Sequence, residues 1–239
     1  MKNFISQINF SIVRDGYLLE IPINTIFTRQ KAGYSNNYIY VSLECFLTEK
    51  EVLNIFKNYL RPIENDELLN YTFGDLVRDA HTFDAIIHGC NCFISMGSGI
   101  AAMISKKFPE AYGVDKKTEK GSKKKLGGYT HYSYDEFTVI NAYTQFYSGA
   151  QEKEQTKERS IYIREWAIRK SMRKIKQNFS GKRLALPLIG AGIAGGDWER
   201  IEKIILEELI GEDVTIVVWE QDNYFRQKIH DLNLCGKNS

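Results

Sequence analysis

Residues 84–104 read DAIIHGCNCFISMGSGIAAMI and join three elements in one short stretch. The apolar run at 84–89 is typical of a buried strand in a parallel sheet. A glycine-rich turn follows, and residues 97–108 then repeat apolar side chains at helical spacing. A strand, a glycine turn and a helix in this order are typical of α/β sheets, which bind ligands beyond the carboxyl ends of their strands.

A second glycine-rich turn repeats this arrangement later in the chain. The stretch LALPLIGAGIAGGDWERIEKII (184–205) covers most of a strand predicted at 183–190 and the start of a helix predicted at 198–209. Backbone N–H groups at such turns and helix starts attract anions, so two facing loops would clamp a diphosphate. Neither loop matches the dinucleotide fingerprint or the phosphate loop of nucleotide hydrolases, which argues against both classes.

Strands and helices alternate through residues 67–239. Further strands are predicted at 68–73, 128–134, 136–146 and 214–220, and an amphipathic helix at 160–179. This alternation predicts a three-layer α/β/α domain with a mixed, mainly parallel sheet. Pro109 is expected to stop the helix at 97–108.

Residues 1–66 have a different pattern. Strand-like pieces at 8–13, 17–23 and 37–47 precede a predicted helix at 48–60, where Thr48 and Glu51 have the spacing of a capping box. We expect a small N-terminal α+β extension before the domain at 67–239. Its role is open, and it is a candidate surface for a protein partner.

The composition of the chain indicates which classes of protein it can belong to. Its 239 residues are 43% hydrophobic and 26% charged, which is typical of a globular protein. With 32 Lys+Arg and 30 Asp+Glu the net charge is +2, and so even a balance does not by itself suggest a nucleic-acid or membrane protein; we expect neither as a partner. No apolar stretch is long enough for a membrane helix. Four scattered cysteines and an N-terminus that meets charge early predict a cytoplasmic protein.

Five pieces of the sequence, taken together, resemble the macro domain family, which binds ADP-ribose. They are Gly74-Asp75-Leu76, DAIIHGCNC, MGSGIA, NAYTQ and LPLIGAGIAGGDW, and they have the family's order and spacing over about residues 68–222. The pair HGCNC and MGSGIA is most similar to the branch that removes phosphate from ADP-ribose 1″-phosphate, some members of which are phage-encoded. The resemblance implies a phosphatase that yields ADP-ribose and inorganic phosphate, without a cofactor or a metal, in a bacterial cell or a phage-infected host.

The resemblance also implies roles for single residues. His88 would handle a proton or position water, and Asn91 would hold the distal ribose. Asp75 would accept the adenine amino group. The residues implied along the diphosphate are those of the two glycine loops, Gly97, Ser98, Gly99, Ile100, Gly190, Ala191, Gly192, Ile193 and Gly195.

These residues also have structural interpretations. A histidine on an apolar strand is often a hydrogen-bonded core residue, Asp75 can cap a turn, and Asn91 can form an Asx turn. His88, Cys90 and Cys92 form an H-x-C-x-C pattern, but no second cluster with zinc-like spacing follows. We therefore predict no metal site.

Two further points stay open. The run KKTEKGSKKK (116–125) contains six lysines and is interpreted as a solvated, mobile loop, or as a site that attracts a polyanion. A non-catalytic ADP-ribose-binding module, or a hydrolase of ADP-ribosyl esters, would use the same loops as the phosphatase. Ala194 stands where one glycohydrolase branch has aspartate, which argues against one such mechanism.

Overall fold

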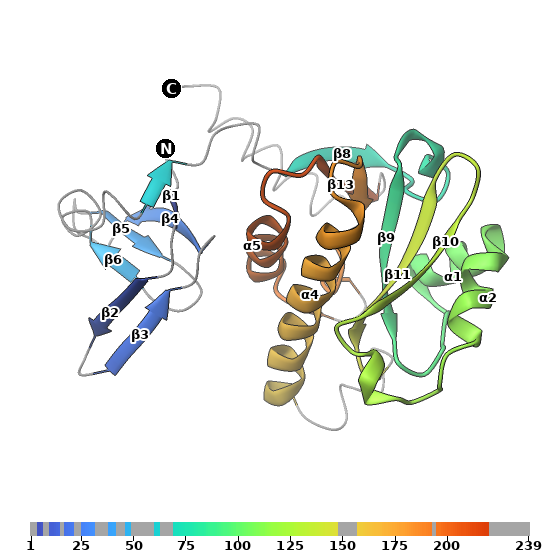
Figure 1. Ribbon diagram of the computed structural model, residues 1–239, viewed down its shortest axis with the longest axis horizontal. Coiled ribbons are helices and arrows are strands. Elements are labelled where there is room, and N and C mark those ends of the chain that lie inside the picture. Colours follow the sequence, from blue (N-terminus) through green and yellow to red (C-terminus); the bar gives the residue numbers. More distant parts are fainter. Residues whose placement is uncertain are drawn as a thin grey trace. The chain divides into compact units, whose positions relative to one another are not determined.

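The chain divides into two compact units. One comprises Met1–Leu68 with Leu206–Gly211, and the other comprises Leu69–Ile205 with Glu212–Ser239 (Figure 1). The computed structural model describes residues 4–6, 10–14, 17–21, 25–31, 38–41, 46–48, 60–62, 69–147, 157–192 and 195–219.

Within Met1–Leu68, the described residues form antiparallel strands. One sheet has the order β6-β5-β4-β1-β7, and β2 pairs with β3 as a separate hairpin. The strand predicted at 37–47 is two antiparallel strands, and the predicted 48–60 helix lies mostly outside the described residues. The bounds are β1 Phe4–Ser6, β2 Phe10–Arg14, β3 Tyr17–Ile21, β4 Ile26–Lys31, β5 Tyr38–Val41, β6 Phe46–Thr48 and β7 Leu60–Pro62.

The second unit is built on a six-stranded sheet of order β10-β11-β9-β12-β13-β8. Every neighbouring pair is parallel except β10 and β11, which form an antiparallel hairpin. The mixed, mainly parallel sheet is therefore confirmed. Its strands are β8 Asn70–Gly74, β9 Ala85–Asn91, β10 Tyr129–Ser133, β11 Thr138–Gln145, β12 Leu184–Leu186 and β13 Val214–Trp219.

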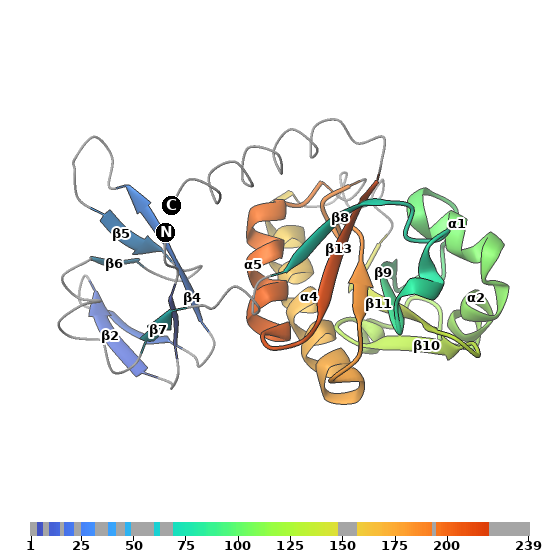
Figure 2. The same cartoon turned by 90° about the horizontal axis from the view of Figure 1, so that it is seen from above.

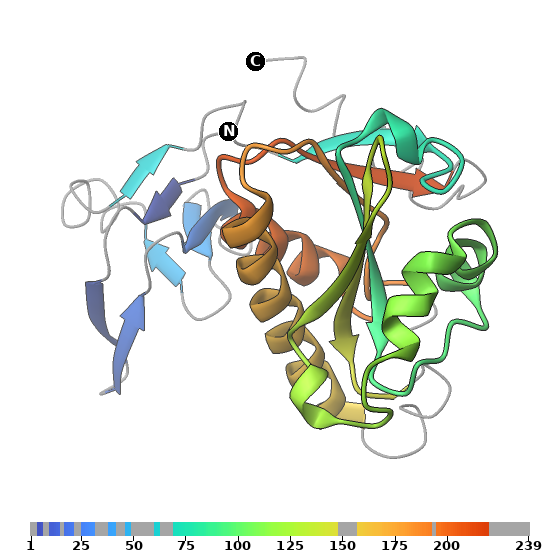
Figure 3. The same cartoon turned by 45° about the vertical axis from the view of Figure 1, so that its right-hand side comes forward.

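Helices cover both faces of this sheet and complete the three layers (Figures 2 and 3). Helices α1 (Gly99–Lys107) and α2 (Pro109–Lys116) lie on one face, and α4 (Lys157–Phe179) and α5 (Trp198–Leu209) lie on the other. Ile168, Met172 and Ile175 form the buried stripe of α4, as their helical spacing predicts. On the opposite face, Ile104 of α1 belongs to a core cluster with residues of the sheet.

Pro109 does not act only as a stop. It ends α1, but it also occupies the first turn of α2. Proline suits that position, because the first N–H groups of a helix have no acceptor within the helix. In the described part of the chain, no helix has the length and apolar character to span a membrane.

Candidate functional site

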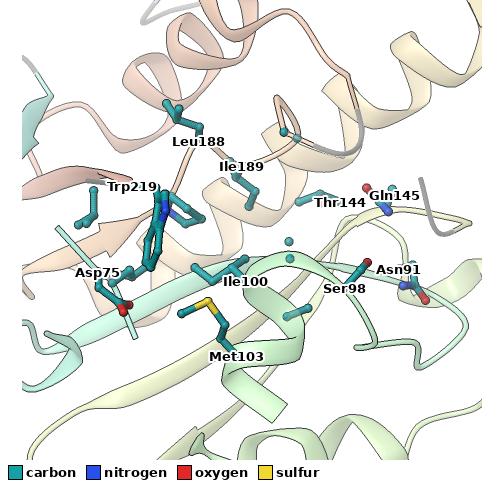
Figure 4. A pocket seen from close by; sticks show the side chains of 18 of the residues that line it. Asp75, Asn91, Ser98, Ile100, Met103, Thr144, Gln145, Leu188, Ile189 and Trp219 are labelled. Atoms are coloured by element: carbon teal, nitrogen blue, oxygen red, sulfur yellow. The ribbon is translucent and has the colours of Figure 1, made fainter. Parts of the chain in front are cut away.

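A pocket of about 460 Å³ opens at the carboxyl ends of the parallel strands (Figure 4). Both glycine loops contribute to it, as the sequence predicts, since parallel strands end at the same edge of the sheet. Its lining is Gly74, Asp75, Leu76, Gly89, Asn91, Ser95, Ser98, Gly99, Ile100, Ala101, Met103, Thr144, Gln145, Pro187, Leu188, Ile189, Gly190, Gly192, Val217 and Trp219.

The start of α1 forms one wall of the pocket. Ser98 is the residue before the helix and has extended backbone angles, φ −146° and ψ 160°. The first helical hydrogen bond there runs from Ala102 N–H to Ser98 O, at 3.3 Å. The N–H groups that precede it have no acceptor within the helix, so they are available to an anion in the pocket.

The second loop forms the facing wall. Gly196 N–H donates to Gly190 O at 2.8 Å, which closes the loop on itself. A side chain at Gly196 would bring its Cβ within 2.7 Å of that same oxygen and 2.8 Å of Ile201 Cδ1. Only glycine allows so close an approach. Ile193 and Ala194 of this loop lie outside the described residues.

Asp75 and Trp219 lie at one end of the pocket (Figure 4). The end of β13 brings them together, because Trp219 pairs in register with Gly74. Asp75 Oδ1 accepts hydrogen bonds from the N–H groups of Val77 (2.9 Å) and Arg78 (3.1 Å), so this carboxylate does cap the turn. Its Oδ2 takes no hydrogen bond from the described residues, which leaves one acceptor for a ligand.

Asn91 and Gln145 lie at the other end of the pocket (Figure 4). The Asn91 side chain forms an Asx turn: its Oδ1 accepts from Phe93 N–H at 2.9 Å, and its Nδ2 donates to Ser95 O at 2.8 Å. The Asx-turn interpretation is therefore confirmed. Asn91 shapes the loop after β9 and also lines the pocket.

His88 does not line the pocket. It is fully buried on the sheet face toward α2, where its Nε2 lies 2.7 Å from Asn141 Oδ1. Asn141 in turn donates to Ala111 O of α2 at 2.8 Å. Because successive side chains of a strand alternate in direction, His88 and Asn91, three positions apart, point to opposite faces of the sheet. The spacing that suggested a shared site instead separates them.

The environment of His88 favours the neutral imidazole. Burial lowers its pKa to about 4, from the usual 6.5. Asn141 uses its amide N–H groups elsewhere, so its Oδ1 accepts and His88 Nε2 carries the proton. The neutral His88 side chain links β9 to β11 through its hydrogen bond to Asn141. It is poorly suited to proton transfer at neutral pH.

Replacing His88 by glutamine is expected to make the folded chain less sensitive to acid. Between pH 6.5 and 4 the unfolded chain protonates His88 and the folded chain does not, so stability present above pH 6.5 is lost as the pH falls. At pH 4.5 this loss is about 2–3 kcal/mol. Glutamine retains a donor for Asn141 but does not titrate. Urea unfolding at pH 7.5 and 4.5 should show a smaller loss in His88→Gln than in the wild type, and equal losses would contradict the assignment.

The two cysteines that flank Asn91 are structural. Cys90 and Cys92 are free and buried, and Cys90 belongs to a core cluster with Tyr143. Burial, with a contribution from nearby Asp115, raises the pKa of the Cys90 thiol well above its usual value, which disfavours a nucleophilic thiolate. No group of three or more His, Cys, Asp or Glu residues gathers into a potential metal site among the described residues.

The remaining predicted residues divide into two sets. Ser98, Gly99, Ile100, Gly190 and Gly192 line the pocket, whereas Gly97, Ala191 and Gly195 do not. Sequence reasoning missed several lining residues, namely Gly89, Met103, Thr144, Gln145, Leu188 and Ile189. A signal for Thr144 and Gln145 was present, because they end a strand parallel to β9.

The chain matches known proteins over part of its length. The family model described as Macro domain matches residues 87–205. A relative from Enterobacteria phage T4, an uncharacterized 17.5 kDa protein of the tk-vs intergenic region, is 34% identical over 163 residues, 64% of this chain and 97% of the relative. The chain belongs to the macro domain family. As a macro domain, it is an ADP-ribose binding or processing module.

Solved structures agree with this fold. A Bacteroides thetaiotaomicron protein of unknown function is similar to this macro domain with a TM-score of 0.51 and 27% identity, over 65% of this chain and 99% of that one. The Oceanobacillus iheyensis macrodomain with MES bound is similar with a TM-score of 0.52 and 16% identity, over 73% of this chain and 95% of that one. At 16% identity, the second likeness concerns the fold alone.

Proposed function

We propose that the pocket binds ADP-ribose in an extended conformation, from Asp75 at one end to Asn91 at the other. The observation that carries this proposal is the pair of glycine-rich walls that face each other between these two ends. A diphosphate between the walls would accept hydrogen bonds from backbone N–H groups on both sides, each contributing about 1.5–3 kcal/mol. The indole of Trp219, 41% exposed, offers a flat apolar surface to a base beside Asp75.

The reaction that we propose is hydrolysis of ADP-ribose 1″-phosphate. Water attacks the terminal phosphorus and the bond from phosphorus to the 1″ oxygen breaks, which releases inorganic phosphate and leaves the hydroxyl of ADP-ribose. Backbone N–H groups of Gly99 and of the second loop would stabilise charge on the phosphoryl oxygens. Asn91 would fix the ribose. His88 would act indirectly, by holding the strand that carries Gly89 and Asn91.

A non-catalytic ADP-ribose module is the second candidate. It is favoured by one observation: among the described lining residues, Asp75 is the only one with an ionisable side chain, and it lies at the end opposite Asn91. No such side chain is therefore placed to act as a general base where the terminal phosphate would bind. The phosphatase proposal thus relies on positioned water and backbone donors.

Phosphate release from ADP-ribose 1″-phosphate, with EDTA present, distinguishes the two candidates. The phosphatase proposal predicts release by the wild type, and His88→Gln, which keeps the hydrogen bond to Asn141, should retain most of the kcat. A kcat at least a hundredfold lower in His88→Gln, at unchanged stability, would mean that His88 takes part directly in catalysis. Binding of ADP-ribose without any release would contradict the phosphatase proposal and favour the non-catalytic module.

Replacing Asp75 by asparagine is expected to weaken ADP-ribose binding by about tenfold to a hundredfold, the range for one hydrogen bond to a charged group. Asparagine keeps the Oδ1 that caps the turn at Val77 and Arg78, but it replaces the free Oδ2 acceptor with a donor. The melting temperature should therefore change little. Asp75→Ala, which removes the cap as well, should lower it by the equivalent of about 1 kcal/mol. Calorimetric titration and thermal unfolding of both variants measure the two effects, and wild-type affinity in Asp75→Asn would contradict the ligand orientation.

A further inference from the structure

Hydrogen bonds and an ion pair connect the lysine-rich segment 116–125 and the residues that follow it to the rest of the macro domain. Gly121 N–H donates to Cys92 O, directly after the strand that carries Asn91, and Gly127 N–H donates to Tyr143 O, each at 2.9 Å. Lys125 forms a buried ion pair with Asp115, with Nζ and Oδ1 3.2 Å apart. The segment, predicted as a mobile solvated loop, is thus ordered by contacts with the domain and ends in the short helix η4 (Lys123–Lys125).

The segment continues onto the surface of α4. A Cβ added at Gly127 would lie 2.7 Å from Lys170 Cδ, and one added at Gly128 would lie 3.8 Å from Lys174 Nζ, so both glycines lie against these lysines. Ser171 Oγ also donates to Gly128 O at 3.1 Å, and η4 lies beside α4 (Figure 3). Lysines of two separate elements therefore share one surface, which we term the lysine face: Lys123 and Lys124 of η4 together with Lys170 and Lys174 of α4, all of them exposed.

The lysine face carries charge that no ion pair among the described residues compensates. None of its four lysines forms an ion pair with a described residue, whereas the basic residues Lys125, Lys176, Arg183 and Arg200 do. The segment 116–125 contains one acidic residue, Glu119. Asp115 precedes the segment and is already paired with Lys125. The overall charge of +2 thus conceals a local excess of positive charge.

Aromatic rings accompany these lysines. Trp166 is 51% exposed on α4, with Lys170 Nζ 4.8 Å from the centre of its ring. Beside Asn91, Phe93 stacks on Tyr147 with ring centres 5.3 Å apart, and Lys123 Nζ lies 5.8 Å from the centre of the Phe146 ring. Cations interleaved with partly exposed rings are the pattern that binds a phosphate backbone together with unpaired bases.

We propose that the lysine face binds single-stranded nucleic acid. Unpaired phosphates would contact the lysines, and a base would stack on Trp166. A duplex keeps its bases stacked within itself and offers no face to Trp166, and an acidic peptide offers no comparable series of flat rings. This surface is separate from the pocket residues, so the proposal does not depend on which reaction the pocket performs.

Fluorescence anisotropy of a labelled dT12 oligonucleotide with the full chain tests this proposal. Binding should weaken as NaCl rises from 50 to 200 mM. Lys123→Gln/Lys124→Gln should make the slope of log K against log salt shallower by about 1.4, since each phosphate contact contributes about 0.7 for single strands. Trp166→Ala should weaken binding by about tenfold, and Trp166→Phe should restore most of it.

The control is Lys106→Gln/Lys107→Gln, at the end of α1. It removes the same charge near Phe108, which packs on Tyr134 and Phe137 at the opposite end of β11 from Tyr143. This control should bind as the wild type does. Absence of binding, or equal losses in the two double variants, would overturn the proposal. Equal binding of inorganic polyphosphate, with no effect of Trp166→Ala, would reduce the surface to a general polyanion site and would also overturn it.

Discussion

Replacing Lys125 by methionine is expected to destabilise the macro domain by about 3–5 kcal/mol. Asp115 is the reason: its side chain is 1% exposed, and its Oδ1 accepts from both Lys125 Nζ and the Tyr143 hydroxyl. Its Oδ2 has no hydrogen-bond partner among the described residues. Methionine fills a similar volume without the charge, so a buried carboxylate would lose its cation. Thermal unfolding should show a melting temperature lower by about 6–20 °C, at about 2–4 °C per kcal/mol for a chain of this size.

Two variants make this test specific. Lys124→Met alters the exposed neighbour in η4 and should change stability by less than about 0.5 kcal/mol. Adding Asp115→Asn to Lys125→Met removes the unpaired charge and should recover a large part of the loss. If Lys125→Met were no less stable than Lys124→Met, the Asp115–Lys125 pair would not hold the segment as described.

Replacing Gly89 by valine is expected to weaken ADP-ribose binding by more than about a hundredfold. A Cβ at this position would lie 3.0 Å from Thr144 Oγ1 and 3.1 Å from Ile189 Cγ1, so the site has almost no spare room. The two methyl groups of valine would extend into the pocket between Asn91 and the second glycine loop. A ligand would then have to displace a packed side chain or give up contacts with one wall.

Calorimetric titration of Gly89→Val with ADP-ribose measures this effect. Some loss of stability, about 1–3 kcal/mol, accompanies overpacking and is to be measured in parallel by urea unfolding. Gly113→Ala is the matched control, because a Cβ there meets nothing within 4 Å and the residue lies on α2, outside the pocket lining. Unchanged binding in a folded Gly89→Val would place the ligand elsewhere.

The architecture of the second unit could be predicted because local patterns agree with one another. Short apolar strands, glycine turns and the amphipathic stripe of α4 all indicate a layered α/β sheet, and the structure has these elements in that order. What local patterns could not supply is the pairing of distant strands. Trp219 lies beside Asp75 only because β13 pairs with β8, more than a hundred residues earlier in the chain.

The placement of His88 shows a different limit. Its sequence neighbourhood suggested a site residue, yet the two-residue period of β9 separates it from Gly89 and Asn91. That period was readable from the sequence, so this is a feature that closer reasoning could have found. Lys125 is the reverse case. Nothing in a run of six lysines distinguishes the one that is buried, because its partner Asp115 is positioned by the end of α2.

The most direct test of the central claim is a calorimetric titration of the full chain with ADP-ribose, beside ADP and AMP. An extended site that runs from Asp75 and Trp219 to Asn91 predicts one bound ADP-ribose per chain. It also predicts that affinity falls in the order ADP-ribose, ADP, AMP, as the distal ribose and then a phosphate are lost. Absence of ADP-ribose binding, or equal affinity for ADP-ribose and ADP, would contradict the assignment of the Asn91 end to the distal ribose.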